Sequence, residues 1–178
     1  MNAPLCRDEQ FHRLFQAIDH DFRLILLTGP ISSGKTTTVK SLFDQLKERE
    51  KAHEFSILQF AHIYIDTGAT IADVLSEVAY QIGNITKRIR TFQLLDQVIN
   101  DNNKKTLICF DSFDLLGDSI ASSLFTQAQA IVSSQLLPNF VFIFVSHVNP
   151  MYLTPLPLTF LNISFPAYKK EEIEEIVT

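Results

Sequence analysis

Residues 29–36 read Gly29-Pro30-Ile31-Ser32-Ser33-Gly34-Lys35-Thr36 and match the pattern G-x-x-x-x-G-K-[ST] in full. An apolar run at residues 24–27 leads directly into this stretch, and apolar residues at helical spacing follow it at Val39, Leu42, Phe43 and Leu46. A loop between a strand and a helix N-terminus offers several backbone N–H groups to one anion. The stretch therefore predicts a phosphate-binding loop rather than a loop that only connects.

Two side chains of this loop have distinct expected roles. Lys35 would reach the β- and γ-phosphates of a nucleotide, and the Thr36 hydroxyl would be a ligand of Mg²⁺. We therefore expect ATP and Mg²⁺ to bind here. The loop residues expected to bind the nucleotide are Gly29, Pro30, Ile31, Ser32, Ser33, Gly34, Lys35, Thr36 and Thr37.

Composition narrows the class of protein. The chain has 178 residues, 46% of them hydrophobic and 20% charged, which is typical of one globular domain. No apolar run approaches the roughly 20 residues of a membrane span, and the first residues do not resemble a secretory signal. The net charge of −5 argues against a broad basic face that binds nucleic acid alone. Cys6 and Cys109 are the only cysteines, so we expect no disulfide framework and a reducing compartment.

Strand and helix patterns alternate along the chain. Helices are predicted near 8–18, from the phosphate-binding loop to about 49, and near 71–82, 88–100 and 119–135, with another starting at 169. Strands are predicted at 23–28, 62–66, 106–110, 140–145 and 158–165, while the apolar residues 55–60 either extend the second strand or form a separate segment. Continuous apolar strands indicate a parallel sheet covered on both faces. The pattern predicts a three-layer α/β fold with a five-stranded parallel sheet.

A second motif complements the loop. Residues 107–110 are an apolar strand that ends in Asp111, whose carboxylate is expected to help hold Mg²⁺, often through water. The alternative is an Asp that caps the next turn. An intact phosphate-binding loop upstream favours the metal role.

The residue after Asp111 weakens the case for hydrolysis. ATPases of the AAA+ kind usually have Glu at this position, where it activates the attacking water. This chain has Ser112, with no His beside it in sequence, and Asp114 is two residues further on. Loss of a general base typically costs about 10²–10⁴ in rate. We therefore predict no catalytic residue, and a chain that holds ATP but splits it poorly.

Arginine usage supports the same prediction. The six arginines are Arg7, Arg13, Arg23, Arg49, Arg88 and Arg90. None follows Arg90, so the second half of the chain cannot supply an arginine finger, which in related enzymes is worth about 10³–10⁵ in kcat. Ser146, just after a predicted strand, is a candidate for contact with the γ-phosphate or a water, whereas His147 is interpreted as structural.

Four segments together resemble origin recognition complex subunits, which are AAA+ proteins. Residues 111–116 resemble the D-x-F-D-x-L stretch of these subunits, and residues 28–40 resemble their P-loop. Residues 6–10 resemble the segment that precedes the first helix in these proteins. Residues 165–168 resemble the F-P-x-Y segment that leads into their lid. The resemblance spans nearly the whole chain. Because Glu is missing after Asp111, the chain is most similar to subunit 5. The alternatives are subunit 4, which often keeps that Glu, and the archaeal initiators.

The resemblance implies a nuclear, ATP-binding AAA+ subunit of the complex that marks replication origins and helps load the replicative helicase. Leu5 to Gln10, which include Arg7, and Tyr168 would border the adenine. Gly34, Lys35, Thr36 and Asp111 would hold the phosphates and Mg²⁺. Partners would be the other subunits, with origin DNA reached through the complex and no membrane. Residues 1–168 would be the nucleotide-binding core and 169–178 the start of a helical lid, which we expect to continue beyond Thr178.

Three other functions are alternatives. An active ATPase or a small-molecule kinase is the main alternative, although small kinases usually clamp the transferred group with lid arginines. A GTPase is disfavoured because Asn103-Lys104-Lys105-Thr106 lacks the Asp of an N-K-x-D segment. A nucleotide-free scaffold is disfavoured because Lys35 and Thr36 are both intact.

Overall fold

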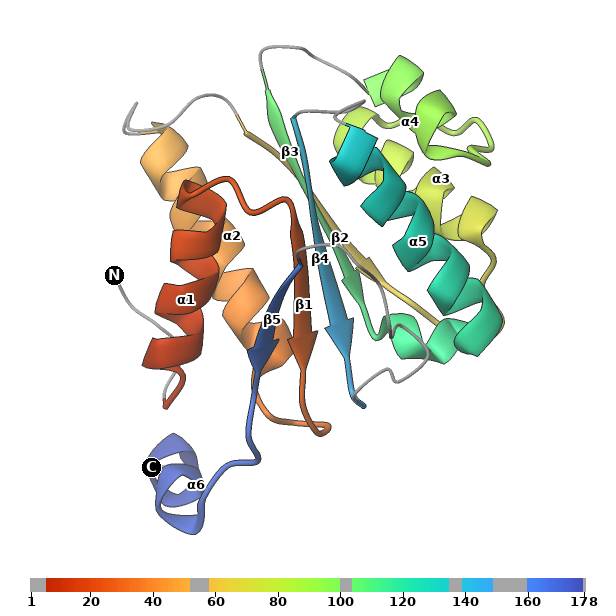
Figure 1. Cartoon of the computed structure of the whole chain (residues 1–178). Helices are drawn as coiled ribbons and strands as arrows, with labels where there is room; N and C mark the ends of the chain where they lie inside the picture. Colours follow the sequence, from red (N-terminus) through yellow and green to blue (C-terminus); the bar gives the residue numbers. More distant parts are fainter. Residues whose placement is uncertain (1–5, 52–57, 100–103, 135–138, 149–159, 178) are drawn as a thin grey trace.

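The computed structural model describes residues 6–51, 58–99, 104–134, 139–148 and 160–177. A five-stranded sheet forms its centre, and every strand pairing in it is parallel (Figure 1). The strand order is β2-β3-β4-β1-β5. The strands are β1 (Leu24–Thr28), β2 (Leu58–Tyr64), β3 (Lys105–Asp111), β4 (Phe140–Ser146) and β5 (Leu161–Ser164). The predicted α/β fold with a parallel five-stranded sheet is confirmed.

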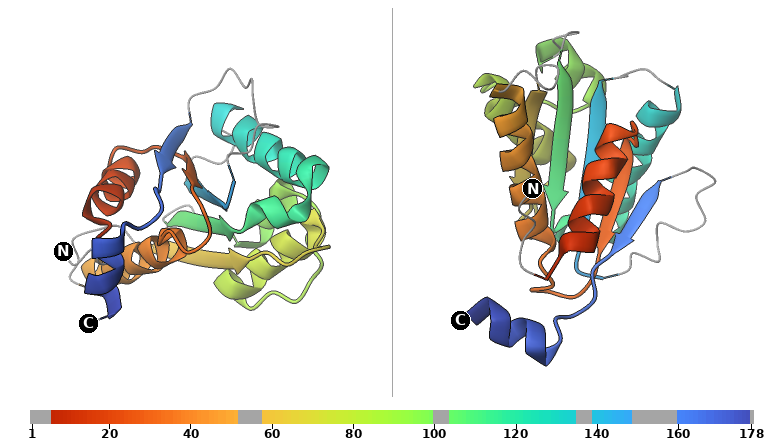
Figure 2. Two further views of the ribbon diagram at one scale, coloured as in Figure 1. Left: turned by 90° about the horizontal axis from the view of Figure 1, so that it is seen from below. Right: turned by 90° about the vertical axis from the view of Figure 1, so that its left-hand side faces the viewer.

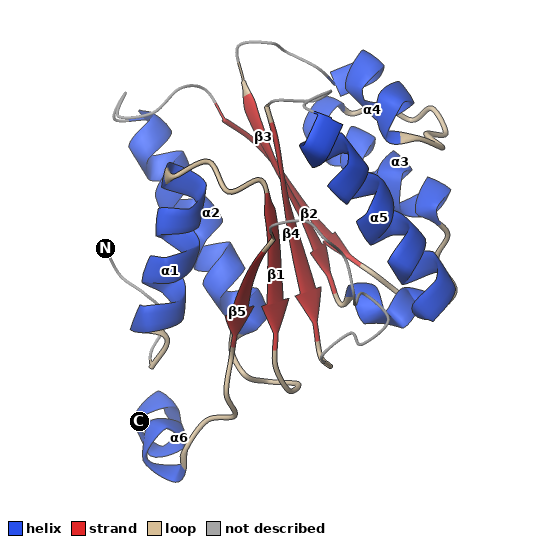
Figure 3. Ribbon diagram, viewed as in Figure 1, coloured by secondary structure: helices blue, strands red, loops and turns tan. Residues whose placement is uncertain are grey.

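Helices cover both faces of this sheet (Figure 3). One face carries α1 (Asp8–Asp19) and α2 (Lys35–Lys51). The other carries α3 (Ile71–Gly83), α4 (Phe92–Ile99) and α5 (Asp118–Ser134), with the short 3₁₀ helix η1 (Phe113–Leu116) before α5. Helix α6 (Lys170–Val177) lies beyond the carboxyl ends of the strands, apart from both layers (Figure 2). No helix in these ranges is long and apolar enough to cross a bilayer.

The central strands are buried along almost their whole length, because alternate side chains enter two different cores. Leu24 and Leu26 of β1 pack into the core under α3, α4 and α5, whereas Ile25 and Leu27 pack into the core under α1 and α2. Strands β3 and β4 are divided in the same way. This explains why the sequence shows continuous apolar runs rather than alternation.

Several element boundaries differ from the predicted ones, and the largest shifts are at the starts of α4 and β2. Helix α4 begins at Phe92 rather than near 88, because the Thr91 side-chain oxygen accepts a hydrogen bond from the Leu94 N–H at 3.2 Å and so caps the first turn. Ile89 is still buried, but its N–H is held by the Ser76 hydroxyl at 2.9 Å, outside any helix. Strand β2 begins at Leu58, so residues 58–60 extend the second strand, whereas residues 55–57 lie outside the described ranges.

The carboxyl ends of three adjacent strands bring the candidate site together. Thr28, at the end of β1, pairs with Ser146 at the end of β4, and Val145 pairs with Asp111 at the end of β3. Ligands of open α/β sheets bind at this edge, outside the carboxyl ends of the strands. The P-loop, Asp111 and the residues after β4 therefore share one edge of the sheet.

Candidate nucleotide-binding site

The P-loop joins β1 to α2 and leaves no room for side chains at its two glycines. A Cβ at Gly29 would lie 2.1 Å from the backbone oxygen of Phe165, the residue that follows β5. A Cβ at Gly34 would lie 2.4 Å from the Tyr168 hydroxyl, and Gly34 also has φ of +90°. The glycines thus let the segment after β5 pack directly against the loop.

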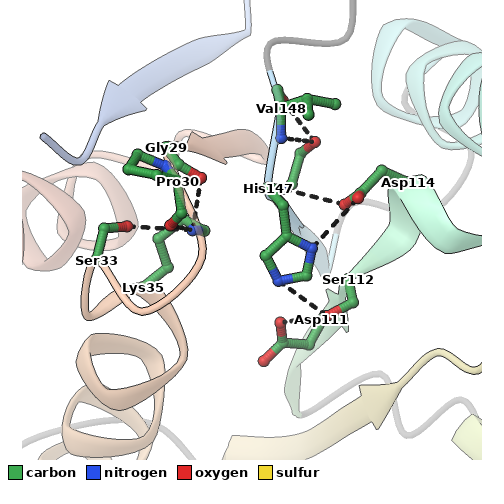
Figure 4. A network of polar contacts seen from close by, with 10 residues as sticks. Gly29, Pro30, Ser33, Lys35, Asp111, Ser112, Asp114, His147 and Val148 are labelled. Carbon is green, nitrogen blue, oxygen red and sulfur yellow. Dashed lines mark hydrogen bonds and ion pairs between the residues drawn. The ribbon is translucent and has the colours of Figure 1, made fainter. Parts of the chain in front are cut away.

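Lys35 is a buried cation that faces this loop (Figure 4). Its ammonium donates to the carbonyl oxygens of Gly29 and Pro30, both at 2.7 Å, and to the Ser33 hydroxyl at 3.1 Å. Burial lowers the pKa of Lys35, and the charges of Asp111 and Asp114 act against that shift. These hydrogen-bond acceptors are neutral, so a phosphate would supply the counter-charge that they lack.

Asp111 lies at the end of β3 and is only 1% exposed. Its carboxylate accepts a hydrogen bond from His62 Nε2 at 3.0 Å and another from the Thr36 side chain. Burial alone raises the pKa of Asp111, but these two hydrogen bonds and the nearby histidines outweigh it, so the pKa falls below its ordinary value. The two predicted metal ligands, Thr36 and Asp111, are therefore in contact, with the acid ionised.

Thr36 and Asp111 suit Mg²⁺ better than they suit a metal ion whose ligands all come from the protein. In the described part of the chain no group of three or more His, Cys, Asp or Glu side chains could hold an ion. Magnesium usually binds through one or two protein ligands, with phosphate oxygens and water completing its shell. Thr36 and Asp111 would hold the ion, which would neutralise phosphate charge when bound.

A cavity of about 480 Å³ opens above the loop. It is lined by residues 32–37 together with His147, Tyr168 and Ile176. This volume lies in the range of sites for small ligands. The predicted loop residues Ser32, Ser33, Gly34, Lys35, Thr36 and Thr37 all line it, and so does Tyr168.

Arg7 lies behind two of the residues that line the cavity, Ser33 and Tyr168. It is 2% exposed, and its Nε donates to the Ser33 carbonyl at 2.7 Å. A second nitrogen donates to the Pro166 carbonyl at 3.0 Å, and the guanidinium carbon lies 3.7 Å from the centre of the Tyr168 ring. Arg7 thus ties the P-loop to the segment after β5. Leu5, which is predicted to border the adenine, falls outside the described residues.

Ser146 is the last residue of β4, and His147 follows it directly. Ser146 is fully buried and its hydroxyl donates to the Val148 carbonyl at 2.6 Å, so it is not part of the cavity lining. His147 lines the cavity instead, and its ring lies between Ser112 and Asp114. The sequence alone favours a structural role for His147, whereas its ring lies at the cavity. Because β3 pairs with β4, the residues that follow these two strands lie close together, and this pairing brings His147 to Ser112 and Asp114.

His62 is a second residue that sequence reasoning did not select. It lies on the edge strand β2, and its ring is stacked on Tyr64 with centroids 4.5 Å apart. The Gln81 side chain bonds both its backbone N–H and its carbonyl, at 2.9 and 3.1 Å. His62 is therefore fixed in position to orient the Asp111 carboxylate.

Comparisons with known proteins agree with this geometry. A family model described as "AAA ATPase domain" matches residues 3–141. The ORC2 protein of Aeropyrum pernix, solved as ADPNP-ADP complexes, superposes with a TM-score of 0.73 at 17% identity, over 98% of this chain and 51% of that one. No curated protein matches the chain.

Two further solved structures share the fold. Drosophila ORC bound to DNA gives a TM-score of 0.71 at 15% identity, covering 99% of this chain and 46% of that one. The Aeropyrum pernix ORC1 protein in complex with DNA gives a TM-score of 0.74 at 15% identity, covering 99% of this chain and 49% of that one. The chain therefore spans about half the length of the proteins that it resembles.

Proposed function

We propose a function from one premise: the chain belongs to the AAA ATPase domain family. Within that family it is an ATP-binding subunit of an origin recognition complex, most similar to subunit 5. The observation that carries this proposal is the complete P-loop around the buried Lys35, combined with Ser112 where a catalytic Glu is usual. ATP with Mg²⁺ is held mainly as a structural ligand, with little hydrolysis.

Bound ATP would stabilise this domain by mass action, because a ligand that binds only the folded state shifts the folding equilibrium. Residues 1–168 form the nucleotide-binding core, and residues 169–178 start a lid that contributes Ile176 to the cavity. The same mass action would stabilise an interface that forms only around the nucleotide.

The proposed partners are the other subunits of a hetero-oligomer in the nucleus. The fold likeness to ORC structures solved with DNA supports this assignment. DNA contact would come through the complex, because a net charge of −5 disfavours phosphate binding by this domain alone.

The nucleotide that accompanies the purified protein tests the proposal. The protein is denatured after purification and the released nucleotide is identified and counted. We expect close to one adenine nucleotide per chain, and almost none from Lys35→Ala. Lys47→Ala is the matched control, since Lys47 is an exposed lysine of the same helix that does not line the cavity. Full occupancy in Lys35→Ala, or a guanine nucleotide, would contradict the proposal.

A further inference from the structure

Three polar residues from two adjacent strand ends form a chain of contacts beside the P-loop. Ser112 and Asp114 follow β3, and His147 follows β4 (Figure 4). His147 Nε2 lies 3.5 Å from the Ser112 hydroxyl, and His147 Nδ1 lies 3.2 Å from an Asp114 carboxylate oxygen. Asp114 is 13% exposed and the His147 side chain 25%, so both groups are partly shielded but within reach of the cavity.

Asp114 fixes the direction of the imidazole. Its other carboxylate oxygen accepts the backbone N–H of His147 at 3.0 Å, so one carboxylate holds both the backbone and the ring of the same residue. A carboxylate can only accept, so Nδ1 must donate its hydrogen to Asp114. In the neutral ring this leaves the lone pair on Nε2, which faces Ser112.

The backbone at Ser112 makes this arrangement possible. Ser112 has φ of +61°, a left-handed conformation that is uncommon for residues other than glycine. The turn buries the Phe113 side chain and directs Asp114 toward the end of β4. Strained backbone of this kind is often found at functional sites.

The Ser112–His147–Asp114 chain of contacts, called the relay from here on, lies at the nucleotide cavity rather than elsewhere on the surface. His147 lines the same cavity as Gly34, Lys35 and Thr36. Asp114 is near enough to Lys35 for its charge to raise the pKa of the ammonium. The Ser112–Nε2 distance of 3.5 Å is at the outer limit of a hydrogen bond, so Nε2 is available to a water molecule.

We infer that His147, oriented by Asp114, takes the place of the missing Glu as proton acceptor for the water that attacks bound ATP, with Ser112 helping to hold that water. This inference rests on the proposed ATP binding at the same site. The water oxygen forms a bond to the terminal phosphorus while the bond from that phosphorus to the bridging oxygen breaks. The bridging oxygen leaves on ADP with the electron pair, and the water proton passes to Nε2 and then to solvent. Imidazole is the commonest general base in enzymes.

Hydrolysis by this relay is slow, because the same half of the chain supplies no arginine to stabilise the charge on the transferred group. It therefore agrees with a domain that holds ATP for long periods. The slow conversion of ATP to ADP would limit how long each ATP molecule stays bound in its original form.

The test follows ADP formation from ATP bound to the purified protein with Mg²⁺, over hours and in a single turnover. We expect His147→Gln to slow ADP formation by about 100-fold or more, and Asp114→Asn to slow it by about 10–100-fold. Because His147 lines the cavity, the rates are compared with ATP fully bound to each variant, so that a change in ATP affinity does not enter the comparison. His20→Gln is the matched control, because His20 is an exposed histidine at the end of α1.

Two further readouts need no kinetic measurement, and the first of them does not depend on hydrolysis. The ¹⁵N spectrum of His147 should show the tautomer with hydrogen on Nδ1, and Asp114→Asn should alter it. The nucleotide released from purified His147→Gln should contain a larger share of ATP than that from the original protein.

A third variant keeps the inference testable if His147→Gln does not fold. Ser112→Glu restores a carboxylate at the usual position, so ADP formation should become faster and should become insensitive to Asp114→Asn.

The possible failures are distinguishable. ADP formation at the original rate in His147→Gln would overturn the relay, and so would ATP that stays bound in the original protein with no ADP formed. Both of those results would leave the proposed ATP binding intact. A failure of the original protein to bind ATP would overturn the proposed function itself.

Discussion

Lys35 has two features that matter for its chemistry. It is buried, and within the described ranges its ammonium is bonded only to neutral oxygens of its own loop. A buried cation without a direct counter-ion is costly, and its charge is better satisfied when an anion enters the cavity. The same residue therefore gives both affinity for phosphate and a reason for the loop to be more stable when nucleotide is bound.

Gly29 is expected to tolerate no side chain. A Cβ there would lie 2.1 Å from the Phe165 backbone oxygen, and backbone cannot move aside as a flexible side chain can. Gly68→Ala is the comparison, because Gly68 has φ of +87° but nothing within 4 Å of an added Cβ. We expect Gly29→Ala to lower the free energy of unfolding by about 1–3 kcal/mol more than Gly68→Ala does, as overpacking usually does. Equal losses in denaturant unfolding would show that the loop and the segment after β5 do not pack as described.

Asp111 is expected to make the domain sensitive to acid. Its pKa is lowered in the folded state, so the folded state binds the proton more weakly than the unfolded state does. The resulting stability is fully present above the ordinary carboxyl pKa of 3.8 and is lost as the pH falls through the lowered folded value. Urea unfolding of the original protein and of Asp111→Asn between about pH 6 and pH 2 measures this. The variant should lose less stability on acidification; identical slopes would contradict the hydrogen bonds assigned to Asp111.

Helix α3 shows how local sequence fixes an element. The Thr70 side chain accepts the Asp73 N–H at 3.3 Å, and the Asp73 carboxylate accepts the Thr70 N–H at 3.0 Å, which completes a capping box. These bonds satisfy backbone groups that the first helical turn leaves unpaired.

Thr70→Ala should therefore lower the free energy of unfolding by about 0.5–2 kcal/mol. The matched control is Thr67→Ala, three residues away in an exposed turn, for which we expect little change. Denaturant unfolding of the two variants compares them. A loss as large for Thr67→Ala as for Thr70→Ala would mean that the cap contributes nothing.

The sequence predicts the elements well where one signal dominates. Three central strands are continuous apolar runs, and the P-loop marks the start of α2, so these parts follow from local pattern alone. The predicted start of α4 is too early because Ile89 is apolar and at helical spacing. Ile89 belongs to the loop before α4, and its side chain is buried in the core. A buried position has the same pattern whether its backbone is helical or not.

The missed site residues have a different cause. His62 contacts Asp111 because β2 lies beside β3, and His147 contacts Asp114 because β3 lies beside β4. The order of strands in a sheet is not the order in the chain, so these contacts depend on topology rather than on spacing. The P-loop, whose residues are adjacent in sequence, could be identified without that knowledge.

At the scale of the whole molecule, the sheet places every part of the site at its carboxyl edge. Strand β3 lies in the interior of this sheet, with β2 and β4 beside it, and delivers Asp111 to that edge. The integrity of the site therefore depends on the sheet remaining intact, and Cys109 within β3 can report on it.

Cys109 is fully buried, and burial raises the pKa of its thiol well above the ordinary value. We expect a thiol reagent to label Cys109 only as fast as the whole domain unfolds, while the partly exposed Cys6 reacts sooner. Cys6→Ser leaves Cys109 as the single thiol for this measurement. ATP with Mg²⁺ should slow the labelling further. Rapid labelling of Cys109 under native conditions would contradict the placement of β3 inside the sheet.

The central claim is that this P-loop domain holds ATP and splits it slowly. Its most direct test is to load the purified protein with ATP labelled on the terminal phosphate, with Mg²⁺, and to follow bound ATP and released phosphate for hours. We expect about one ATP per chain, with phosphate released over hours and ATP still the main bound species at early times. Rapid and repeated turnover that Lys35→Ala abolishes would contradict it, as would the absence of bound ATP.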